Sequence, residues 1–155
     1  MPLLEFLNPD SVVPSLRARS KKQVLQDLAA QAARRLPMLA ERAVFETLLQ
    51  RERLGSTGIG EGVAIPHGKL PGLDRLYGLF ARFDRPVDFE AFDGQPVDIA
   101  FLLLAPEGAG ADHLKALAQV ARVLRVPGML GGIRAARDAG ALYALLTQNA
   151  APQAA

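Results

Sequence analysis

Hydrophobic residues recur three and four positions apart in two stretches near the start of the chain, which is the spacing of an amphipathic helix. The first stretch runs from Ser20 to Pro37, and its apolar members are Val24, Leu25, Leu28, Ala29, Ala32 and Leu36. Ser20 followed by Gln23 has the form of a capping box, which favours a helix start at this point. The second stretch predicts a helix over 40–53, with Gly55 just past its end and an apolar face of Val44, Phe45, Leu48 and Leu49.

Shorter apolar runs in the first half and the middle of the chain predict strands. Residues 11–16 contain two adjacent valines, and Pro14 limits this strand to a sheet edge because proline cannot donate to a ladder. Residues 76–83 alternate in polarity, whereas 99–105 is continuously apolar and typical of a central strand buried on both faces. Asp93-Gly94 predicts a turn between these two strands.

Helical spacing returns in the last third of the chain. It begins at His113 and stops at Pro127-Gly128, and the residues assigned to its buried face are Leu114, Leu117, Ala118, Ala121 and Leu124. A final helical region over 133–146 is expected to break near Gly140. Helices around a β-rich middle predict an α/β fold, a single-domain sandwich with a mixed central sheet flanked by helices. We assign the domain to 1–148 and a flexible tail to 149–155.

Composition is consistent with one domain inside the cell. The 155 residues are 50% hydrophobic and 22% charged, which suffices for a single core. The chain has no cysteine, which excludes disulfides and thiol chemistry and fits a reducing compartment. No signal-peptide pattern opens the sequence, and its longest apolar run, 99–105, is far too short to span a membrane. We therefore expect a cytoplasmic protein without membrane insertion.

The charge pattern gives no indication of a nucleic-acid partner. The formal net charge is only +2, and basic residues occur in pairs such as Lys21-Lys22 and Arg34-Arg35 among acidic ones. There is no long basic run interleaved with aromatic residues, so solvated helix faces explain these pairs better.

The segment Gly58–Lys69, GIGEGVAIPHGK, contains a histidine between a proline and a glycine. Pro66 restricts the backbone before His67 and Gly68 adds no side chain beside it, so the imidazole can be both exposed and held. A dinucleotide loop is disfavoured because its glycines follow a strand, whereas these precede the β-prone Val63-Ala64-Ile65. From the residues alone, a structural histidine and a reactive one are equally compatible with this segment.

The longer run Arg51–Lys69, RERLGSTGIGEGVAIPHGK, resembles the active-site signature of the enzyme IIA domains of the bacterial phosphotransferase system. The resemblance is to the fructose/mannitol type, most of all to its nitrogen-regulatory branch. It is supported by Asp112-His113-Leu114 and spans nearly the whole chain. It implies that His67 is phosphorylated by a small histidine-containing phosphocarrier protein. It also implies that Arg51 lies beside His67, and that His113 lies across the pocket and stabilises the phosphate.

The predicted helix ends give a physical reason for Arg51 and His113 to act near a phosphate. Arg51 falls near a predicted helix C-terminus, where cations are favoured. His113 falls in the first turn of a predicted helix, with Asp112 as the candidate N-cap, where anions are favoured. From the residues alone, ordinary helix-end preferences explain both positions better than a functional role does.

Three further residues of the signature have alternative roles. Ser56 and Thr57 either cap the end of the second helix or donate hydrogen bonds to phosphate. Glu61 either orients a ring nitrogen of the histidine or faces solvent. Lys69 is compatible with a partner surface.

No cofactor and no metal are expected. A zinc set of His67, His113, Asp112 and Glu61 matches no compact ligand spacing. The leading hypothesis is a phosphohistidine carrier whose phosphorylation state regulates target proteins, such as a kinase or a transporter. The alternatives are a sugar-specific IIA that passes phosphate to a IIB component, and a binding module that accepts no phosphate.

Overall fold

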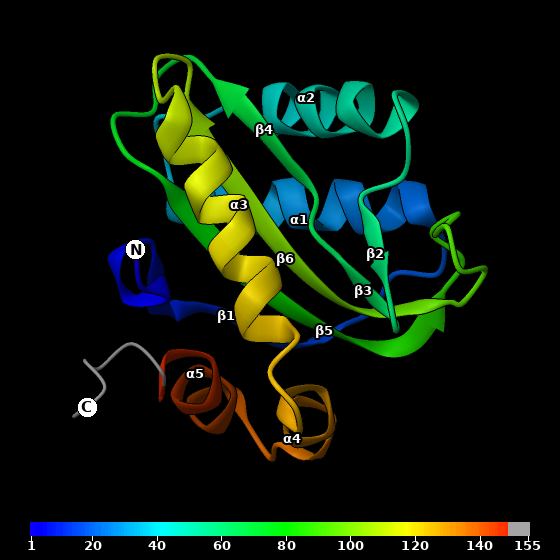
Figure 1. Cartoon of the computed structure of the whole chain (residues 1–155). Helices are drawn as coiled ribbons and strands as arrows, with labels where there is room; N and C mark the ends of the chain where they lie inside the picture. The colour runs from blue at the N-terminus through cyan, green and yellow to red at the C-terminus, as the bar shows by residue number, and fades with distance from the viewer. Residues whose placement is uncertain (149–155) are drawn as a thin grey trace.

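A mixed β-sheet lies between two layers of helices in the computed structural model, which describes residues 1–148 (Figure 1). The predicted tail at 149–155 lies outside the described residues. The described elements follow in chain order: η1 (Leu3–Glu5), β1 (Leu7–Leu16), α1 (Lys21–Arg35), α2 (Glu41–Arg53), β2 (Gly58–Gly60), β3 (Val63–Ala64), β4 (His67–Leu70), β5 (Tyr77–Val87), β6 (Val97–Pro106), α3 (Ala111–Leu124), α4 (Met129–Ala135) and α5 (Ala139–Thr147). The predicted α/β sandwich with a mixed sheet is confirmed.

Strand β6 is the centre of the sheet, whose order is β1-β5-β6-β3-β2, with β4 also paired to β6. It runs antiparallel to β5 and parallel to both β3 and β4. Strand β1 lies at the edge, as Pro14 predicts, and pairs with β5 in parallel. The strands predicted at 11–16, 76–83 and 99–105 are all present, and each is longer than the apolar run that predicted it.

Each face of the sheet has its own hydrophobic core. Leu102 and Leu104 of β6 pack in the core that α1 and α2 cover. Phe101 and Leu103 pack in the core that α3, α4 and α5 cover. Because successive side chains of a strand point to opposite faces, the continuous apolar run of β6 supplies both cores at once.

The start of α1 follows the predicted capping box with one variation. Ser20 accepts a hydrogen bond from the backbone N–H of Gln23 at 3.1 Å, as expected. The Gln23 side chain reaches back one residue further, to the N–H of Arg19 at 2.8 Å. Two donors at the helix start are thereby satisfied.

The predicted buried face of α3 is partly wrong. Leu114 is 68% exposed and Ala118 is also exposed, whereas the buried residues are His113, Ala116, Val120, Val123 and Leu124. The helix begins at Ala111, and its N-cap is Gly110 with φ 56°, not Asp112. The predicted face is rotated from the true one because the polar His113 is buried while the neighbouring apolar Leu114 is exposed.

The predicted break near Gly140 is present, at residues 136–138. Helix α4 ends at Ala135 and α5 begins at Ala139, so Gly140 lies in the first turn of α5. Asp138 sets the new start, because its side chain accepts a hydrogen bond from the N–H of Ala141 at 2.9 Å.

Candidate functional site

Helix α2 and strand β4 bring Arg51 to His67. His67 opens β4, where it pairs with Leu103 of the central strand, and Arg51 lies in the last turn of α2. The Arg51 Nε–H group donates to Nε2 of His67 at 3.3 Å, and its Nη1 donates to the carbonyl of Gly55 at 2.9 Å. The guanidinium therefore joins the imidazole to the loop that follows α2.

The hydrogen bonds of the His67 ring define its tautomer. Nδ1 lies 2.8 Å from the carbonyl oxygen of Ile65. A carbonyl can only accept, so Nδ1 carries the proton and Nε2 retains its lone pair. The unprotonated nitrogen, the one able to attack an electrophile, is therefore the nitrogen beside Arg51.

Close packing between α2 and β4 requires a glycine after His67. A Cβ at position 68 would lie 2.5 Å from Cγ2 of Thr47 on α2. Gly68 thus allows the strand carrying His67 to approach the helix carrying Arg51.

The ring of His113 also lies beside the imidazole. The two rings have centroids 5.5 Å apart at an interplanar angle of 62°. His113 is buried in the first turn of α3, and its Nε2 has no hydrogen-bond partner among the described residues. Buried polar atoms are seldom left unpaired, so this nitrogen is a candidate to contact a bound group.

Both histidines are biased towards the neutral form. Burial is the main cause that lowers the pKa of His67 below its usual 6.5; the charge of Arg51 lowers it too, while the Ile65 carbonyl and Glu52 act in the opposite direction. Burial likewise lowers the pKa of His113, with contributions from His67 and Lys69. A neutral imidazole is the form that can act as a nucleophile.

A buried carboxylate behind Arg51 was missed by the sequence reasoning. Glu52 accepts hydrogen bonds from the backbone N–H of Thr57 at 3.0 Å and from its hydroxyl, and it pairs with Lys21 at 3.1 Å. A signal was available, because Glu52 continues the four-residue spacing of the buried Val44 and Leu48. The carbonyl of Ile65 gave no such signal, because backbone groups are the same at every position.

Ser56 and Thr57 have partners within the protein. The Ser56 hydroxyl donates to the carbonyl of Phe89 at 2.8 Å and accepts from the N–H of Gly58 at 3.1 Å. The Thr57 hydroxyl donates to Glu52. These contacts hold the loop between α2 and β2, and a role for either hydroxyl in phosphate binding stays a prediction.

Glu61 is not brought to the histidine. Its neighbour Gly62 accepts from the N–H of Asp98, whereas His67 pairs with Leu103. These two β6 residues are five positions apart, or about 16 Å along a strand. The ring nitrogens of His67 contact Ile65 and Arg51 instead, so the idea that Glu61 orients the ring is wrong.

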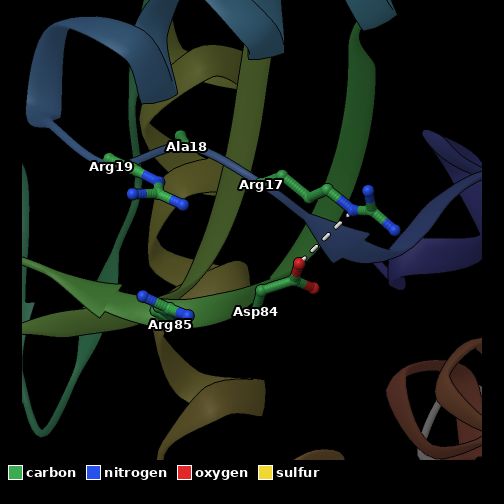
Figure 2. Close-up of a pocket in the computed structure, with 5 residues that line it drawn as sticks. All are labelled: Arg17, Ala18, Arg19, Asp84 and Arg85. Carbon is green, nitrogen blue, oxygen red and sulfur yellow. Dashed lines mark ion pairs between the residues drawn. The ribbon is translucent and has the colours of Figure 1, made fainter.

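Another charged hollow lies at the far end of β5, lined by Arg17, Ala18, Arg19, Asp84 and Arg85. Figure 2 shows Arg17 turned towards Asp84, with which it forms an ion pair at 3.5 Å. The site around His67 lies near the opposite end of β5, where Gly78 pairs with Leu103.

Residues 1–148 show neither a cluster suited to a metal ion nor a helix suited to span a membrane. In this range, no group of three or more histidine, cysteine, aspartate or glutamate side chains is arranged to hold a metal ion. None of the helices described there is long and apolar enough to cross a membrane.

Comparison with known proteins gives matches along nearly the entire chain. The chain is 62% identical over 146 residues to the nitrogen regulatory protein of Bradyrhizobium diazoefficiens, covering 94% of this chain and 95% of that one. It is 42% identical over 144 residues to the nitrogen regulatory protein of Pseudomonas aeruginosa, with 93% and 94% covered.

Solved structures agree with the fold. The nitrogen regulatory protein IIA-Ntr of Neisseria meningitidis superimposes with a TM-score of 0.86 at 37% identity, covering 92% of this chain and 97% of that one. The mannitol IIA of Escherichia coli superimposes with a TM-score of 0.73 at 18% identity, with 90% and 97% covered, and supports the fold alone.

The family model described as "Phosphoenolpyruvate-dependent sugar phosphotransferase system, EIIA 2" matches residues 5–149. The chain therefore belongs to the EIIA 2 family of this phosphotransferase system, which implies a role in phosphoryl transfer.

Proposed function

We propose that this protein is a cytoplasmic phosphohistidine carrier of the nitrogen-related phosphotransferase system. It accepts a phosphoryl group on His67 from a histidine-containing phosphocarrier protein, and its phosphorylation state regulates partner proteins. The observation that carries this proposal is the pairing of the His67 ring. The carbonyl of Ile65 accepts a hydrogen bond from the protonated Nδ1, so the lone pair on Nε2 lies beside the Arg51 guanidinium.

In the proposed reaction, Nε2 of His67 attacks the phosphorus atom of the donor's phosphohistidine. The new P–N bond forms as the donor P–N bond breaks, and the electron pair of that bond stays on the donor imidazole. Nδ1 of His67 keeps its proton, and the Ile65 carbonyl stabilises the positive charge that the ring acquires. Arg51 donates to the phosphoryl oxygens, and the unpaired Nε2 of His113, whose ring packs against His67, is available as a further contact.

Two exposed leucines flank this arrangement and fit a docking surface for the donor. Leu54 is 84% exposed and follows Arg51 by three residues, and Leu114 adjoins His113. Apolar side chains this exposed beside a reactive group are typical of a contact surface. The domain needed for this function is assigned to 1–148.

The first experiment is phosphorylation of the purified protein. We expect an acid-labile mass increase of one phosphate on incubation with phosphoenolpyruvate, enzyme I and the phosphocarrier of the nitrogen branch. His67→Ala should abolish it because the nucleophile is gone. An unlabelled wild type would favour the binding module that accepts no phosphate, and a labelled His67→Ala would place the phosphate on another residue.

The supporting residues are tested by transfer rates. Arg51→Ala and His113→Ala should each slow labelling by on the order of 100-fold, the effect of removing one donor that stabilises developing charge. Arg53→Ala is the matched control, because Arg53 lies in the same helix turn and is exposed. Wild-type rates in either variant would remove that residue from the site.

The protein to which the phosphate is passed on distinguishes this proposal from the alternative of a sugar-specific IIA. Two relatives named nitrogen regulatory protein, at 62% and 42% identity, favour the regulatory role. A labelled protein that passes its phosphate rapidly to a sugar-specific IIB component would instead support the sugar-uptake alternative.

A further inference from the structure

Glu52 is a buried carboxylate that the proposed reaction does not use. Its side chain is only 3% exposed, although carboxylates are seldom buried without a cation. Three donors surround it: the N–H and hydroxyl of Thr57, and the ammonium group of Lys21. Because burying a charge is costly, this arrangement is expected to serve a purpose beyond stability.

Lys21 holds Glu52 from a different helix. It opens α1, its side chain is 17% exposed, and its ammonium group lies 4.9 Å from the centre of the Phe89 ring. It also contacts the exposed Glu90 at 3.3 Å. Lys21 therefore fastens the end of α2 to the start of α1 and to the segment after β5.

The contacts of Glu52 also restrain Arg51, the arginine proposed to stabilise the phosphoryl group. Glu52 follows Arg51 directly in the last turn of α2. The Glu52 carboxylate binds Thr57 at the end of the loop that follows α2. The Arg51 guanidinium binds the carbonyl of Gly55 in the middle of the same loop. The turn that carries Arg51 and the loop that leads to β2 are thus held from both sides, which limits where the guanidinium can lie relative to His67.

We propose that Lys21 and Glu52 form a buried ion pair that positions Arg51 at His67 and balances the charge behind the site. The inference deepens the proposed function, because a phosphoryl acceptor needs an aligned guanidinium and no excess negative charge. Glu52 supplies the anchor, and Lys21 keeps its carboxylate from repelling the incoming phosphoryl group.

The charges around His67 allow this role to be distinguished from a merely structural one. Arg51 and Glu52 act on the pKa of His67 in opposite directions, and the His113 ring packs edge-on against the His67 ring. Removing the Glu52 charge should lower the pKa of His67. Removing the Lys21 charge should raise it, because the carboxylate is then uncompensated. A loss of packing alone would not give two shifts of opposite sign.

The test is titration of the His67 ring by NMR in Glu52→Gln, Lys21→Met and the double variant. We expect a lower pKa in Glu52→Gln, a higher one in Lys21→Met and an intermediate one in the double variant. Glu46→Gln is the matched control, since Glu46 forms an exposed ion pair with Arg42 on the same helix and should change nothing. No shift in Glu52→Gln, or shifts of the same sign in both single variants, would overturn the proposal.

Kinetics provide a second readout in the full chain. With the nitrogen-branch phosphocarrier as donor, kcat should fall roughly 10- to 100-fold in Glu52→Gln while KM for the donor stays within twofold, because Arg51 is misaligned but the docking surface is intact. An unchanged kcat would contradict positioning. If Lys21→Met does not fold, Glu52→Gln decides alone, because glutamine has nearly the same size and shape as glutamate and only the charge is removed. If the wild type accepts no phosphate, the proposed function fails, while the titration still judges the ion pair.

Discussion

At the scale of single residues, the environment of the two histidines determines how the protein responds to pH. Both rings are buried enough for their pKa values to fall below the usual 6.5. His67 therefore remains neutral at pH values where a solvent-exposed histidine is already protonated. An Nε2 lone pair held beside an arginine is available for attack over a correspondingly wider pH range.

The free energy of unfolding should depend on these two rings. Below pH 6.5 these two side chains bind protons in the unfolded chain that they resist in the folded one, so their contribution to stability is complete above 6.5 and is lost as the pH falls through the lowered pKa values. Urea unfolding at a series of pH values between 7.5 and 5 measures the slope. A variant with His67→Gln and His113→Gln should have a shallower slope. An identical slope in that variant would contradict the assignment of this pH dependence to the two histidines.

At the scale of elements, the site depends on how closely α2 approaches β4. The backbone at Gly68 contacts the Thr47 side chain, and the approach of these two elements places Arg51 within reach of His67. No feature of α2 or β4 taken alone creates the site.

Gly68→Ala should force the two elements apart. The added methyl group would lie 2.5 Å from Thr47 Cγ2, so we expect destabilisation by about 1–3 kcal/mol together with slower labelling of His67. Thr47→Ala in the same chain removes the colliding methyl group and should restore most of the lost stability and most of the lost labelling rate. The measurements are urea unfolding and the phosphorylation rate.

Gly131→Ala serves as the control for this substitution. A Cβ at Gly131 meets nothing within 4 Å, and the residue lies in helix α4, so stability should be unchanged or higher by about 0.5–1 kcal/mol. If Gly68→Ala behaves like Gly131→Ala, the close approach of α2 and β4 is not essential.

At the scale of the whole molecule, β6 links the two cores. Leu102 packs under α1 and α2, and Leu103 packs under the other helices, so neighbouring residues of one strand support opposite layers. His67 pairs with this strand at Leu103, a fully buried residue.

Leu102→Ala and Leu103→Ala should therefore be comparably damaging. Each leaves a cavity in a separate core, and we expect each to lower the free energy of unfolding by about 2–5 kcal/mol, measured by urea or thermal unfolding. Leu114→Ala, at a position that is 68% exposed, should change it by less than about 0.5 kcal/mol. A tolerated substitution on either face would mean that β6 is not buried on both sides.

The positions of the main helices and strands were easier to predict from the sequence than their buried faces and their exact ends. The apolar run at 99–105 identified the central strand because only a strand covered on both sides lacks polar residues. The face of α3 was not predictable in the same way, because His113 is buried and Leu114 is exposed. Only the position of the neighbouring His67 ring gives a reason for a histidine to turn inwards there.

The sequence by itself determined three of the strands and the main helices, the edge position of β1 and the segment that carries His67, because periodicity and proline chemistry are local properties. The resemblance of that segment also brought Arg51 and His113 into consideration. Only the tertiary structure decided that Glu61 lies away from the ring, that Ile65 holds Nδ1, and that Lys21 neutralises Glu52. These are contacts between elements or with the backbone, and their geometry depends on how the layers pack against the sheet.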